Sequence, residues 1–91
     1  MNTLAKSLET EAIAIDVQFT KDMICLVLAD GREVKTPLEF YPVLAKATEA
    51  QLNNYRLIGD GSGIHWNDLD EDLSVESIVL GRKAFNYSRA G

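Results

Sequence analysis

The segment that decides the fold covers residues 55–75 and reads YRLIGDGSGIHWNDLDEDLSV. It holds the chain's single Trp, its single His and its densest acidic run. Two short apolar pieces flank a glycine-rich turn, which predicts a bent strand or a hairpin. We expect Trp66 to anchor the core, with the partly exposed His65 on the opposite strand face and Gly63 supporting the turn.

A run of carboxylates follows this strand. Its members are Asp68, Asp70, Glu71 and Asp72. Their spacing lacks the alternating acids, central glycine and distal glutamate of a calcium loop, so no metal site is predicted. We expect a solvated acidic elbow leading into a helix over residues 75–80, which Ser74 caps and Gly81 ends.

Upstream of this segment the sequence predicts three antiparallel strands in a meander. Apolar and polar residues alternate over 13–20, with Ile13, Ile15, Val17 and Phe19 on the predicted core face. The unbroken apolar run 23–29 is typical of a central strand covered on both sides. Asp30-Gly31 favours a two-residue type I′ turn into a third strand over 32–36.

Short, irregular helices are expected between the meander and the deciding segment. Residues 36–39 read Thr-Pro-Leu-Glu, the pattern of a capping box with proline at the first helical position. Pro42 interrupts that helix and starts another. Residues 48–51 form a second capping box, which predicts a helix through residue 54 or 55.

The chain of 91 residues suffices for one α+β domain. We assign it to residues 13–80, preceded by an N-terminal arm over 1–12 and followed by a C-terminal tail over 81–91. Hydrophobic residues make up 46% and charged residues 25%, as in ordinary globular proteins. A lone cysteine excludes an internal disulfide, and the sequence shows neither a signal peptide nor a membrane span, so we expect a cytoplasmic protein.

Composition and motifs argue against an enzyme. The glycine loop 59–63 lacks the lysine of a P-loop and the spacing of a dinucleotide fingerprint, so no cofactor is predicted. No motif pairs His65 with a nucleophile, and Cys25 falls in the predicted central strand, where thiols are inert. The formal net charge of −5 repels phosphate backbones and anionic membranes from the domain body.

The C-terminal tail is basic, whereas the chain as a whole is acidic. Over 82–89 it interleaves three basic residues with two aromatic ones and contains no acid. Three interpretations remain open: a disordered or weakly docked end, an arm that contacts protein, or a grip on single-stranded nucleic acid.

Five stretches of the sequence are distinctive when taken together: DGREV at 30–34, PLEFYP at 37–42, LAKATEAQ at 44–51, YRLIGDGSGIHW at 55–66 and LDEDLSVE at 69–76. In this order they resemble a small prokaryotic family known as domain of unknown function 2442. The resemblance spans about residues 13–80 and implies a compact α+β domain. It also implies the antitoxin place of a type II toxin–antitoxin pair, with a small partner of the family called domain of unknown function 4160.

We therefore predict a non-enzymatic, acidic protein-binding module, with a small basic toxin-like protein as partner. The contact is expected around Phe40 and Tyr41 and on the acidic elbow, because opposite net charges speed encounter and a few buried anchors supply affinity. Exposed sheet edges favour a homodimer. The alternative is a dimeric nucleic-acid-binding or transcription-regulating protein that acts through its basic tail.

Overall fold

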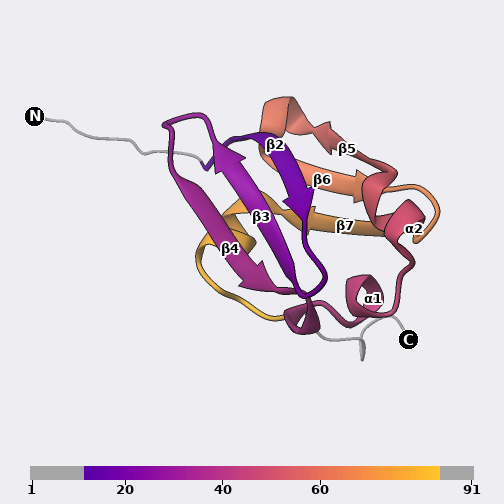
Figure 1. Ribbon diagram of the computed structural model, residues 1–91. Helices are drawn as coiled ribbons and strands as arrows, with labels where there is room; N and C mark the ends of the chain where they lie inside the picture. The colour runs from indigo at the N-terminus through magenta and orange to yellow at the C-terminus, as the bar shows by residue number, and fades with distance from the viewer. Residues whose placement is uncertain (1–11, 85–91) are drawn as a thin grey trace, which may run out of the picture.

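Two three-stranded antiparallel sheets form most of the structure, a computed structural model that describes residues 12–84 (Figure 1). Their strands follow the chain in order, β2-β3-β4 in one sheet and β5-β6-β7 in the other. The α+β class and the initial meander are confirmed. Most of the N-terminal arm and the tail beyond residue 84 lie outside the described residues.

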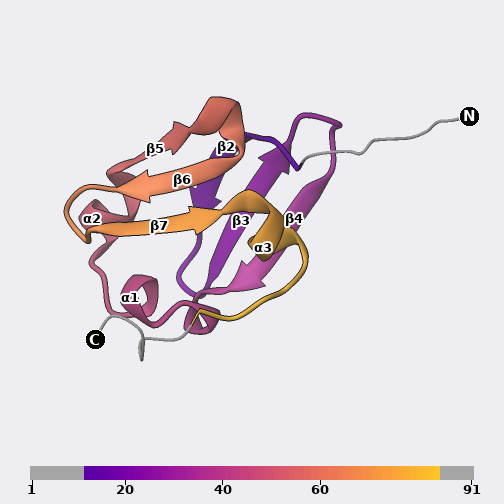
Figure 2. The same cartoon turned by 180° about the vertical axis from the view of Figure 1, so that it is seen from behind.

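The first sheet contains β2 (Ala14–Phe19), β3 (Met23–Leu28) and β4 (Glu33–Pro37). The second sheet packs on one face of it, and no element of the described chain covers the other face (Figures 1 and 2). Ile24 and Leu26 are fully buried, whereas Met23 and Val27 are only half-buried. The central position of this strand is confirmed, but its expected cover on both sides is wrong, although Cys25 on the uncovered face is itself buried.

A β-bulge in β2 reverses part of its predicted pattern. Ala14 pairs with Leu28 and Asp16 with Val27, so Ile15 is the extra residue. Ala14 is buried at 2% exposure, and Ile15 is 61% exposed. A bulge shifts the two-residue alternation by one position, which explains why the expected core place of Ile15 is wrong.

The hairpin at Asp30-Gly31 has a different turn from the expected one. Only Gly31 adopts a positive φ, of 96°, whereas a type I′ turn needs two such residues. The Gly31 amide donates to the Leu28 carbonyl and the Leu28 amide donates to Arg32. This pattern is that of a longer loop that ends on a left-handed glycine.

Three short helical elements connect the sheets: η1 (Leu38–Phe40), α1 (Pro42–Ala45) and α2 (Glu49–Asn53). The second capping box is confirmed, because the Thr48 hydroxyl accepts from the Gln51 amide while the Gln51 side chain accepts from Thr48. The first is wrong. Residues 36 and 37 end β4, and no side chain caps η1.

The deciding segment folds into the second sheet and its helix. It contains β5 (Tyr55–Ile58), η2 (Gly59–Gly61), β6 (Gly63–Trp66), β7 (Glu71–Ser74) and α3 (Val75–Val79). The hairpin is confirmed, but the predicted acidic elbow is in part a strand. Residues 71–74 pair with β6, which gives their backbone groups ladder partners that a solvated turn would lack.

One apolar core lies between the two sheets. Trp66 is fully buried, and its indole nitrogen donates to the Leu52 carbonyl at 3.0 Å, which ties β6 to α2. The α3 helix contacts both β4 and β7, closing one side (Figure 2). Among residues 12–84 no helix is long and apolar enough to cross a membrane.

Candidate functional site

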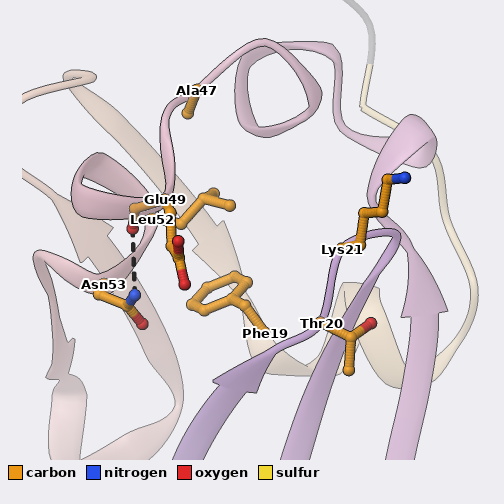
Figure 3. A pocket seen from close by; sticks show the side chains of 7 residues that line it. All are labelled: Phe19, Thr20, Lys21, Ala47, Glu49, Leu52 and Asn53. Atoms are coloured by element: carbon orange, nitrogen blue, oxygen red, sulfur yellow. Dashed lines mark hydrogen bonds between the residues drawn. The ribbon is translucent and has the colours of Figure 1, made fainter.

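A cleft lies between the β2–β3 turn and the segment that enters α2 (Figure 3). Its volume is about 470 Å³. The lining residues are Phe19, Thr20, Lys21, Ala47, Glu49, Leu52 and Asn53. A volume of this size is within the usual range of ligand sites, and the mixed lining suits a partner with apolar and polar groups.

An aromatic ring forms the floor of the cleft. Phe19 is half-buried and meets Tyr55 and Trp66 edge-on, with ring centroids 6.2 and 6.4 Å apart. Leu52 closes the same floor, and its carbonyl accepts the Trp66 indole bond. The floor is therefore fixed to the core by packing and by a buried hydrogen bond, which favours a preformed site.

A second depression, of about 380 Å³, has one lining residue in common with the first, Lys21. Its lining residues are Lys21, Asp22, Met23, Pro37, Leu38, Glu39 and Ala45. We call the two depressions together the groove. Three exposed carboxylates, those of Asp22, Glu39 and Glu49, flank the groove beside its one lysine. Within residues 12–84 none of these carboxylates forms an ion pair, so the rim is acidic.

The outer face of the second sheet carries a polar row of Arg56, His65 and Asp72, which are cross-strand neighbours. Nδ1 of His65 bonds Oδ1 of Asp72. No hydroxyl or thiol nucleophile bonds His65 in the described chain, and Cys25 lies on the other sheet, where its thiol donates to the Glu33 carboxylate at 4.0 Å. The row therefore joins β6 to β7 as a cross-strand contact.

The expected partner-contact residues are spread over different environments. Phe40 is half-buried under the Lys83 ammonium, which lies 4.9 Å from the ring centroid. Tyr41 is 1% exposed and Glu71 8%. Placing these last two on a contact surface is wrong, because Tyr41 belongs to the core and Glu71 is enclosed at the start of β7.

Burial also affects the chemistry of Tyr41. Its hydroxyl lies close to Thr36 but makes no hydrogen bond of normal geometry. Desolvation raises the pKa of Tyr41 above its usual value, and the neighbouring Thr36 hydroxyl offsets part of that effect. The phenol is therefore neutral at physiological pH, and the side chain contributes to the core through apolar packing.

The other elbow residues are exposed. The Asp68 carboxylate accepts from the Asn54 amide at 3.2 Å, and Asp70 has a left-handed backbone with φ 51°. Asp72 and the almost fully buried Tyr41 are among the residues that line a further depression. No group of three or more metal-ligating side chains occurs among residues 12–84.

The glycine loop is a structural turn. Gly59, Asp60 and Gly61 have successive positive φ values of 59°, 59° and 99°. A Cβ on Gly61 would collide with the Ala14 carbonyl, so only glycine lets η2 lie against β2. Gly63 starts β6 beside Ile58, within 3.0 Å of where its Cβ would stand.

Sequence reasoning missed the groove. It assigned Phe19 to the core and treated the 20–22 turn and Glu49 as local structural signals. The groove forms because residues 19–23 and 37–53 meet in space, and no single stretch carries that information. The one available signal was the aromatic residue at the end of a half-buried strand, followed by three polar residues.

Comparisons with known proteins agree with the architecture. A family model described as Protein of unknown function (DUF2442) matches residues 14–84. The crystal structure of a protein of unknown function from Rhodospirillum rubrum ATCC 11170 is similar, with a TM-score of 0.74 and 25% identity over 86% of this chain and 96% of that one.

A second solved structure, the solution structure of an uncharacterized protein from Chromobacterium violaceum, has a TM-score of 0.69 and 26% identity. The match covers 86% of this chain and 73% of that one. No curated protein matches the chain. Because the family model spans most of the chain, with both sheets and the groove, the chain belongs to the DUF2442 family of proteins of unknown function.

Proposed function

We propose that this chain is a non-catalytic protein-binding module whose groove takes a segment of a basic partner protein. The observation that carries this proposal is the aromatic floor at Phe19 with Glu49 beside it, next to a second depression lined by Asp22 and Glu39; none of these three carboxylates forms an ion pair within residues 12–84. Apolar floors supply binding free energy, while rim charges select partners and speed encounter. The net charge of −5 means that the whole molecule also attracts a basic partner.

Within this proposal the chain is the antitoxin of a type II toxin–antitoxin pair, and its partner is a small basic toxin-like protein. The resemblance described above supports this assignment. An acidic protein and a basic partner attract each other at long range, which raises the association rate and makes it salt-dependent. The module acts in the cytoplasm, where such a partner would be made.

The test is co-expression with the product of the adjacent gene, followed by calorimetry on the purified pair. The groove variant carries Asp22→Asn, Glu39→Gln and Glu49→Gln. The matched control carries Glu33→Gln, Asp60→Asn and Asp70→Asn, which remove equal charge elsewhere. We expect the groove variant to bind at least about tenfold more weakly and the control to change affinity by less than about threefold. Absence of binding by the wild-type chain, or equal effects of the two variants, would contradict the proposal.

A second candidate is nucleic-acid binding through the C-terminal basic residues. The observation in its favour is that Arg82 and Lys83 are adjacent and exposed just beyond α3. Affinity for single-stranded DNA that falls steeply with salt, and that is lost on deleting residues 82–91, would support this candidate. Binding that survives the deletion would remove it.

A further inference from the structure

We propose that the cleft at Phe19 is a pocket for an arginine side chain. The guanidinium group of a partner segment stacks on the Phe19 ring and donates hydrogen bonds to the Glu49 carboxylate and to the side-chain oxygen of Asn53. The inference rests on the proposed function, because it names the side chain by which a basic partner protein is anchored in this cleft.

Three electron-rich groups line the same cleft. Phe19 is the last residue of β2, and Glu49 and Asn53 begin and end α2. Side chains four positions apart on a helix are neighbours, so the two α2 residues form one wall beside the ring. Figure 3 shows the Glu49 carboxylate turned towards the Phe19 ring. A positive group in the cleft would therefore meet the carboxylate and the ring together.

The chain itself supplies no cation to this wall in the part that the structure describes. The ion pairs within residues 12–84 involve neither Glu49 nor Lys21. Figure 3 shows the Lys21 ammonium on the opposite side of the cleft, directed away from Glu49. The Asn53 amide nitrogen donates to the Glu49 carbonyl at 3.1 Å, which holds this side chain in place and leaves its oxygen as an acceptor.

The arrangement suits a guanidinium better than an apolar group or an ammonium. An apolar group over Phe19 would shield the Glu49 carboxylate from water without pairing it, which is unfavourable. A guanidinium is planar, so it can lie on an aromatic ring while its N–H groups reach acceptors beside that ring. A lysine ammonium lacks this flat face and is more strongly hydrated. The cleft volume of about 470 Å³ has room for the whole arginine side chain.

The experiment titrates the full chain with Nα-acetyl-arginine amide and follows the backbone amide signals by NMR. We expect saturable shifts at residues 19–21 and 47–53, with millimolar affinity. The matching lysine amide should bind at least about threefold more weakly, and the neutral citrulline amide should give no saturable shifts. Absence of saturable shifts with arginine, shifts centred elsewhere, or equal binding of arginine and either analogue would overturn the proposal.

Two variants locate the site. Glu49→Gln and Phe19→Leu should each weaken arginine binding at least about threefold, whereas Glu76→Gln, which removes a charge on α3 outside the cleft, should leave it unchanged. Because Glu49 is exposed, Glu49→Gln leaves the core intact and provides the test even if Phe19→Leu destabilises the chain. Equal binding by wild type and Glu49→Gln would overturn the proposal.

A separate readout concerns the partner. If the arginine amide binds the cleft but the adjacent-gene product does not bind the chain, the arginine pocket stands and the proposed function fails. If that product binds wild type and the double variant Phe19→Leu with Glu49→Gln equally well, the arginine anchor is contradicted, whereas protein binding stands. A loss of about tenfold or more in the double variant, with Glu76→Gln unchanged, supports both.

Discussion

At the scale of single residues, two tyrosines show that the more deeply buried hydroxyl is not the one with the hydrogen bond. Tyr55 is half-buried and its hydroxyl donates to the Val17 carbonyl at 3.1 Å, joining the second sheet to β2. Tyr41 is almost fully buried, and its hydroxyl lacks a bond of normal geometry. Removing the same oxygen atom from each residue should therefore have different effects on stability.

We expect Tyr55→Phe to lower the free energy of unfolding by about 0.5–1.5 kcal/mol, because a partly buried hydrogen bond is lost. Tyr41→Phe should leave it unchanged or raise it by up to about 1 kcal/mol, because an unsatisfied hydroxyl no longer has to be desolvated. Urea denaturation of both variants provides the comparison. A larger loss for Tyr41→Phe than for Tyr55→Phe would contradict the assigned environments.

Tyr41 also predicts an alkaline dependence of stability. Burial raises the pKa of Tyr41 in the folded chain above that of an unfolded tyrosine, which is about 10. Above that pH the folded state holds more protons than the unfolded state, so stability falls as pH rises towards the folded pKa. The contribution of Tyr41 to the free energy of unfolding is fully present below about pH 10. The free energy of unfolding should fall less steeply above about pH 10 in Tyr41→Phe than in wild type, and identical slopes would refute this.

Two glycines with similar backbone angles differ in their surroundings. Gly31 has φ 96° and nothing within 4 Å of where a Cβ would stand, whereas Gly61 has φ 99° and lies against the Ala14 carbonyl. Gly31→Ala should cost about 1–2 kcal/mol from backbone strain alone. Gly61→Ala should cost a further 1–3 kcal/mol or so, because β2 must move. Equal losses in thermal unfolding would show that η2 does not press on β2.

At the scale of elements, two similar capping sequences behave differently: one caps a helix and the other does not. Thr48 and Gln51 satisfy each other's backbone amides at the start of α2, which positions Glu49 and Leu52 at the cleft. The similar sequence at residues 36–39 does not cap, because Thr36 is buried in the β4 ladder. A local motif predicts a helix only where tertiary pairing leaves it free.

The two motifs give a matched pair of substitutions. Thr48→Ala should lower the free energy of unfolding by about 0.5–2 kcal/mol, since it removes a cap that α2 uses. Glu39→Ala, at the last residue of the 36–39 motif that does not cap, should stay within about 0.5 kcal/mol of wild type. Guanidinium denaturation gives both values. A destabilisation by Glu39→Ala as large as that by Thr48→Ala would mean that residues 36–39 do cap a helix.

At the scale of the whole molecule, sequence patterns gave the first sheet, the second hairpin and the core place of Trp66. They missed the third strand of the second sheet, because Glu71 and Asp72 have low strand propensity and only pairing with β6 makes 71–74 extended. They also missed the groove. Its two sides come from separate stretches, and Phe19 fits a core and a cleft floor equally well.

The central claim is that a partner binds across the groove. It is tested most directly by hydrogen–deuterium exchange on the full chain, alone and bound to the adjacent-gene product. The account predicts added protection at residues 19–23 and 37–53, with little change at residues 63–74, where β6 and β7 carry their polar outer row. Protection confined to 63–74, with the groove unchanged, would contradict it.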